Sequence, residues 1–74
     1  SVRAHMSRVL RQLQEAKFIE FGELFEPQEG ISVLVVTFLA VLELAREGLI
    51  ELSQHEAYTP IYVKLRGGQL AAVA

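Results

Sequence analysis

Residues 31–48 read ISVLVVTFLAVLELAREG, a stretch that is apolar on nearly every side and ends at a glycine. The stretch is too long for one strand, and it is too short and too charged at its end to span a membrane. The spacing therefore predicts a helix that stops at Gly48, because glycine readily takes the left-handed conformation that ends helices. The predicted core stripe of this helix consists of Leu34, Val35, Phe38, Val41, Leu42 and Ala45.

The other face of this helix is also apolar, with Glu43 and Glu47 as its only charges. A chain of 74 residues has little core with which to bury two apolar faces of one helix. Either the helix is central and wrapped by the chain, or a partner covers its second face. The apolar and small side chains of this second face are Val33, Val36, Thr37, Ala40 and Leu44.

The composition indicates one small domain without thiol chemistry. The chain is 51% hydrophobic, has a net charge of −2 and contains no cysteine. Its seven basic residues are scattered, so no run of them would neutralise phosphates. No signal peptide or lipidation motif is visible. Because the chain begins without an initiator methionine, we expect a fragment of a longer protein.

Shorter patterns precede the long helix. Residues 1–16 predict an amphipathic helix that Ser1 could cap. Residues 17–21 are rich in aromatic and β-branched side chains and predict a small strand. One or two helical turns follow over residues 22–26, and Pro27 ends them because proline cannot continue helical hydrogen bonding. The inward side chains of the first helix are predicted to be Met6, Val9, Leu10 and Leu13.

Two alternating segments follow the long helix. Residues 49–54 and 61–66 each place apolar side chains on one side, which predicts a β-hairpin with a six-residue loop. The element order is that of a winged helix, in which a hairpin covers the open side of three helices. We therefore expect an α+β winged-helix domain over residues 1–66, with three helices, a short strand and a C-terminal β-hairpin wing. Residues 67–74 are expected to form a flexible tail.

The sequence offers no set of side chains for catalysis or metal binding. His5 and His55 are far apart, and neither cysteine nor aspartate is present to complete a metal site. Ser53 lies close to His55, but nothing supplies an orienting acid or an oxyanion hole. We expect no enzyme activity, no catalytic residue, no cofactor and no metal ion.

DNA binding is the usual function of a winged helix, and its third helix often enters the major groove. Here that helix offers two glutamates, which repel phosphate, and Arg46 lies at its far end. Lys64 and Arg66 on the hairpin supply little non-specific binding energy. A DNA-binding winged helix of a transcription regulator stays open as the alternative.

The pattern favours a protein-interaction module. Its candidate surface joins the second face of the long helix to the hairpin, where tyrosines can bury a large flat area and keep a polar tip. The candidate partner-binding residues are Val33, Val36, Thr37, Ala40, Tyr58, Ile61 and Tyr62.

Other arrangements of these residues stay open. Tyr58 could instead fold over the core as a lid, and Tyr62 could pack on the edge of the sheet. The last strand could be an edge that offers free backbone groups to a partner strand. The apolar helix face could also pair with itself in a homodimer.

Two segments resemble one family. They are FGELF at residues 21–25 and VVTFLAVLELAREGLIELSQHEAYTPIYV at residues 35–63. Their order and spacing over residues 2–65 resemble the C-terminal winged-helix domain of the kleisins, and most of all the bacterial family of segregation and condensation protein A. The strand and hairpin are also similar to the C-terminal end of eukaryotic cohesin kleisins.

The resemblance implies a non-enzymatic adaptor. In this family the C-terminal winged helix docks on the ATPase head of an SMC protein, on the face away from the coiled coil. An N-terminal domain binds the neck of the other SMC subunit, and a central region recruits segregation and condensation protein B. The kleisin thereby closes a ring that condenses and segregates chromosomes. The resemblance thus implies a cytoplasmic, nucleoid-associated protein that reaches DNA only through its complex and has no membrane contact.

Overall fold

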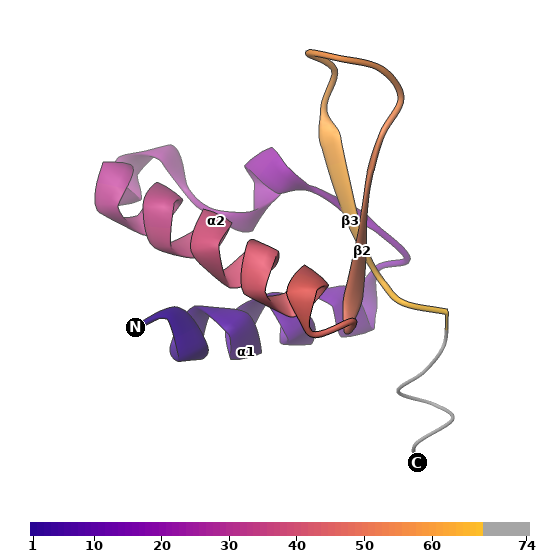
Figure 1. Ribbon diagram of the computed structural model, residues 1–74. Helices are drawn as coiled ribbons and strands as arrows, with labels where there is room; N and C mark the ends of the chain where they lie inside the picture. Colours follow the sequence, from indigo (N-terminus) through magenta and orange to yellow (C-terminus); the bar gives the residue numbers. More distant parts are fainter. Residues whose placement is uncertain (68–74) are drawn as a thin grey trace.

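The structure, a computed structural model, describes residues 1–67 and folds them into two α-helices and a three-stranded antiparallel sheet (Figure 1). The predicted α+β class is therefore confirmed. Apart from Gly67, the predicted flexible tail lies outside the described residues. The elements in chain order are α1 (Val2–Glu15), β1 (Ile19–Glu20), the 3₁₀-helices η1 (Phe21–Leu24) and η2 (Pro27–Glu29), α2 (Ile31–Arg46), β2 (Ile50–Gln54) and β3 (Ile61–Leu65).

The two α-helices begin and end where local chemistry favours it. The hydroxyl of Ser1 accepts a hydrogen bond from the backbone N–H of Ala4 at 3.3 Å, as the predicted cap requires. Gly48 follows α2 with a φ of 79°, the left-handed conformation expected there. Within residues 1–67, no helix has both the length and the apolar character needed to cross a bilayer.

The second of the three predicted helices is not an α-helix. The segment instead forms the 3₁₀-helices η1 and η2. The backbone N–H of Glu20 donates to the carboxylate of Glu23 at 3.2 Å, and that of Glu26 donates to Glu29 at 2.9 Å. These short-range bonds satisfy the backbone within three residues, and Pro27 lacks the N–H that a continuous α-helix would use.

The sheet has the strand order β1-β3-β2, so β3 lies in its centre. Val63 of β3 faces Leu52 of β2 on one side and Ile19 of β1 on the other. The prediction that the last strand is an edge is therefore wrong, because β1 returns to pair with it. The hairpin stands at one end of the helix pair, and its loop projects away from the helices (Figure 1).

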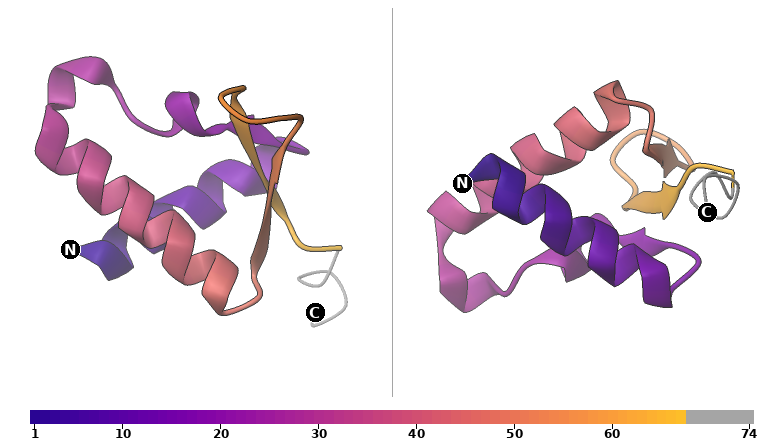
Figure 2. Two further views of the ribbon diagram at one scale, coloured as in Figure 1. Left: turned by 45° about the horizontal axis from the view of Figure 1, so that its top comes forward. Right: turned by 90° about the horizontal axis from the view of Figure 1, so that it is seen from below.

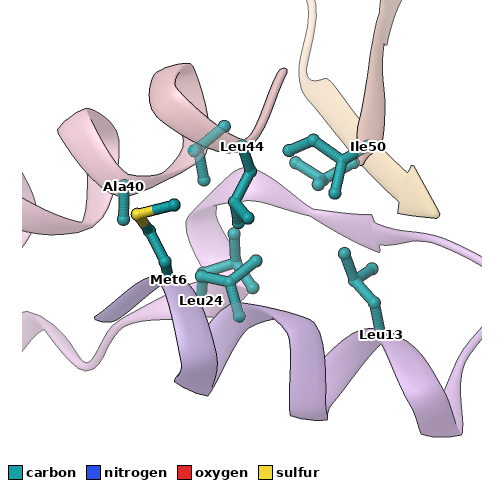
Figure 3. Close-up of a cluster of buried hydrophobic side chains, with 9 residues drawn as sticks. Met6, Leu13, Leu24, Ala40, Leu44 and Ile50 are labelled. Carbon is teal, nitrogen blue, oxygen red and sulfur yellow. The ribbon is translucent and has the colours of Figure 1, made fainter. Parts of the chain in front are cut away.

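The core lies where α1 crosses α2 and the sheet covers the end of the pair (Figures 2 and 3). All but one of the predicted inward residues of α1 are fully buried, and Leu10 is partly buried. Met6 points toward Ala40, whose small side chain leaves room for it (Figure 3). The buried hydrophobic residues are Met6, Val9, Leu13, Leu24, Ala40, Val41, Leu44, Ile50 and Val63.

The predicted core stripe of α2 is confirmed at Val41, which is buried, and at Ala45, which packs against the core, but it is wrong at Val35, Phe38 and Leu42. Val35, Phe38 and Leu42 are largely exposed, and Leu34 and Ala45 are only partly buried. The side chains that α2 turns inward are Thr37, Ala40, Val41 and Leu44. Because α2 is apolar around most of its circumference, its periodicity specifies a helix but not which side meets α1.

Candidate protein-interaction surface

Five large apolar side chains of α2 are exposed and form what we call the α2 strip. Their exposed fractions run from 42% at Leu42 to 75% at Ile31. All except Leu39 follow the spacing i, i+4, i+7, i+11, which places them in one row along the helix. The α2 strip consists of Ile31, Val35, Phe38, Leu39 and Leu42.

Aromatic rings from η1 and the residue after it support the middle of the α2 strip. The ring of Phe38 meets that of Phe21 edge to face, with centroids 5.8 Å apart. Phe25 lies behind Phe21 at 6.1 Å. Edge-to-face pairs are a preferred aromatic geometry, so Phe38 is held in place while nearly half of it stays accessible.

Two of the predicted partner-binding residues do not reach the surface. Thr37 and Ala40 are 1% and 0% exposed, because this side of α2 faces the interior. Val33 lies in the same helix row as Thr37 and Ala40, and Val36 lies on the flank of that row. Both are partly buried, as is Ile61 in β3. The structure therefore does not join these residues into one exposed face.

The two predicted tyrosines lie in different surroundings. Tyr58, in the β2–β3 loop, is fully exposed, so the alternative of a lid over the core is wrong. Tyr62 packs its ring edge to face against Phe18 at 5.4 Å. These two rings line a hollow of about 440 Å³ together with Glu51, Ser53 and Lys64. Tyr62 therefore packs on the face of the sheet rather than at its edge.

The sequence analysis missed the outward orientation of Ile31, Leu39 and Phe18. Ile31 and Leu39 belong to the same apolar helix whose two faces could not be distinguished from the sequence. No signal in the sequence marked their exposure, because no polar residue distinguishes the outer side of α2 from the inner side. Phe18 lies directly before the short strand β1, where its alternation with Ile19 places it on the other face of the sheet.

Glutamates neutralise several of the basic side chains. Arg8 lies 3.7 Å from Glu29, and Lys64 lies 3.5 Å from Glu51. The Nε of Arg46 donates to Glu43 at 3.0 Å, and a second nitrogen of the same guanidinium contacts the other carboxylate oxygen. This hydrogen-bonded cation lowers the pKa of Glu43. Three of the seven basic side chains are thus engaged by acids rather than gathered into a phosphate-binding patch.

Side chains that could hold a metal ion do not cluster in the described part of the chain. Within residues 1–67, no three histidine, cysteine, aspartate or glutamate side chains come together. The surface features that the structure does present are apolar and aromatic, which suit contact with another protein.

The chain is similar to proteins of one bacterial family. The family model described as "Segregation and condensation protein ScpA" matches residues 1–66. Proteins named segregation and condensation protein A are similar to it in Xylella fastidiosa (45% identity over 64 residues, 86% of this chain and 21% of the relative) and Coxiella burnetii (42% over 67 residues, 90% and 25%). The relative in Listeria welshimeri is 41% identical over 73 residues, 96% of this chain and 29% of the relative. The chain thus spans less than a third of the length of these relatives.

Proposed function

The chain belongs to the segregation and condensation protein A family, and from this premise we propose that it is the C-terminal winged-helix domain that docks on the ATPase head of an SMC protein. The family is one of non-catalytic kleisin subunits. In the proposed winged helix, η1 and η2 occupy the place of the second helix, and the β2–β3 hairpin is the wing.

The α2 strip is the observation that carries this proposal. Burying a large apolar side chain stabilises a protein by about 1.5–3 kcal/mol, so five exposed ones on one helix forgo a large stabilisation in a small domain. Contiguous exposed apolar patches of this kind mark protein–protein contacts. Docking on an SMC head would bury the exposed parts of these side chains and recover part of that stabilisation.

The charge distribution supports docking on a protein rather than on DNA. The chain is acidic overall, and Arg8, Arg46 and Lys64 are paired with glutamates. We therefore propose that DNA is reached only through the SMC complex, in the cytoplasm at the nucleoid. Segregation and condensation protein B would bind other regions of the full-length protein.

A binding experiment with matched charge substitutions tests the proposal. We expect the chain to bind a purified cognate SMC ATPase head in isothermal titration calorimetry, and Val35→Glu to weaken binding at least tenfold because it places a charge in the α2 strip. Gln14→Glu adds the same charge at an exposed position on the other helix, α1, outside the strip, so it should bind like the wild type. Circular dichroism would verify that each variant is folded.

Two further variants test the surface predicted from the sequence. Val36→Glu lies on the flank of α2 beyond the buried side, and Tyr62→Glu lies on the outer sheet face. If a folded Val36→Glu variant loses binding while Val35→Glu keeps it, docking uses that flank and not the strip. Failure of the wild type to bind SMC heads would overturn the proposed function itself.

A further inference from the structure

Tyr58 is the one non-glycine residue within residues 1–67 that has a positive φ, at 68°. This left-handed conformation is unfavourable for a bulky L-residue, whereas glycine or asparagine adopts it readily. Packing within the fold does not compensate for this cost, because the Tyr58 side chain is fully exposed. The position therefore holds a side chain that is poorly suited to its backbone and makes no internal packing contact.

Hydrogen bonds on both sides of Tyr58 impose the loop conformation. The hydroxyl of Thr59 accepts from the backbone N–H of Glu56 at 3.1 Å and donates to the carbonyl of Glu56 at 2.6 Å. The backbone N–H of Thr59 also donates to that carbonyl at 3.2 Å. The side-chain amide of Gln54 donates to the carbonyl of Thr59 at 2.8 Å. The loop thus presents the Tyr58 ring from a braced backbone at the tip of the hairpin.

A strained residue that persists without internal contacts indicates a role outside the fold. We propose that Tyr58 is an anchor residue that inserts into a pocket of the protein on which the domain docks, with apolar walls around the ring and a hydrogen-bonding group at the hydroxyl. The inference rests on the proposed function, since it takes the SMC head as that protein. A tyrosine on a braced backbone has only two side-chain torsions to fix when it binds, and tyrosine is common among the residues that dominate interface energies.

The charge of the loop favours a protein pocket over nucleic acid. Residues 55–60 read HEAYTP, so Glu56 is their only formal charge at neutral pH. A wing tip that contacts DNA needs lysine or arginine for the phosphates, and a carboxylate beside the ring would oppose such a contact. A largely uncharged tip with one aromatic ring fits an apolar pocket instead.

The experiment measures stability and binding in the same set of variants. Tyr58→Asn should raise the Tm by a few degrees, because asparagine tolerates the left-handed conformation, and should weaken binding to the SMC head at least tenfold. Tyr58→Phe should keep the Tm of the wild type and weaken binding less, since only the hydroxyl is lost. His55→Asn is the matched control in the same exposed loop and should change neither quantity.

Each of the other possible results would refute one step of the inference. If wild type and Tyr58→Asn bind SMC heads equally, the anchor is refuted while the proposed function stands. If Tyr58→Asn lowers the Tm, the strain that underlies the inference is refuted. If the wild type does not bind SMC heads, the proposed function itself is refuted. If the wild type instead retards duplex DNA and Tyr58→Asn does not, the ring serves nucleic acid and the protein pocket is refuted.

Discussion

Thr37 carries a hydroxyl group into the interior, where Oγ1 has no hydrogen-bond partner within residues 1–67. A buried polar group without a partner loses its hydration and gains nothing in return. Thr37 therefore suits this position by its size and not by its polarity. Its unpaired hydroxyl lowers the free energy of unfolding of the domain.

Replacing Thr37 with valine should therefore stabilise the domain. Thr37→Val keeps nearly the same shape and removes the unpaired hydroxyl, so we expect the free energy of unfolding to increase by about 1 kcal/mol. For a domain of this size that corresponds to a rise in Tm of about 4–8 °C. Thr37→Ser, which keeps the hydroxyl and loses a buried methyl, should lower the Tm. A lower Tm for Thr37→Val would mean that the hydroxyl is satisfied in solution.

The contact between Glu43 and Arg46 makes the stability of the domain depend on pH. Arg46 lowers the pKa of Glu43 below its usual value in the folded state, so this carboxyl stabilises the fold above its unfolded pKa. The stabilisation is lost as the pH falls through the folded pKa. The Tm of Glu43→Gln should consequently fall less than that of the wild type between about pH 6 and about pH 3.

Arg46→Gln is the control for this pH dependence. It removes the cation that lowers the pKa of Glu43, so it should flatten the same part of the Tm profile. The side chain of Arg46 is exposed and that of Glu43 is partly exposed, so added salt should weaken the effect in the wild type. A Glu43→Gln profile that parallels the wild type would show that the pair contributes nothing.

At the scale of elements, α2 has two apolar sides with different roles. Leu44 is fully buried, while Leu42, two residues earlier, is 42% exposed in the α2 strip. One helix therefore supplies the core with its inner side and keeps its outer, equally apolar side exposed. The same substitution should therefore change the stability of the domain by different amounts on the two sides of α2.

A pair of alanine variants measures this difference. Leu44→Ala should destabilise the domain by about 2–5 kcal/mol, because it leaves a cavity in the core. Leu42→Ala should cost about 1 kcal/mol or less, because half-exposed side chains lose little on truncation. Urea unfolding followed by circular dichroism would give both values. Equal losses of stability in the two variants would show that Leu42 belongs to the core, as the sequence pattern predicted.

Elements with one apolar side were predictable from the sequence. Residues 1–16 and the two hairpin strands were predicted to within two residues of their observed bounds, because polar side chains mark their outer faces. α2 was predicted as a helix, but its orientation was not, since nothing polar marks an outer face. The assignment of Thr37 and Ala40 to a partner surface failed for the same reason, and the left-handed Tyr58 depends on loop hydrogen bonds that no periodicity encodes.

At the scale of the whole molecule, the charge distribution favours docking on a protein over binding to DNA. A net charge of −2 and the pairing of Arg8, Arg46 and Lys64 with glutamates leave little to attract phosphates. We expect no retardation of a duplex of about 30 base pairs at about 50 mM salt, conditions that favour even weak non-specific binding. Retardation that disappears as salt is raised would instead favour the transcription-regulator alternative.

The central place of β3 also governs how the chain can acquire its fold during synthesis. β3 is the last described strand to leave the ribosome, yet β1 and β2 pair only through it, and Val63 completes the core. Until residues 61–65 emerge, β1 and β2 have no neighbouring strand and the core lacks Val63, although α1 can already pack on the inner side of α2. The sheet and the core can therefore be completed only after residues 61–65 have been translated, and until then the unpaired strands and the outer side of α2 are exposed.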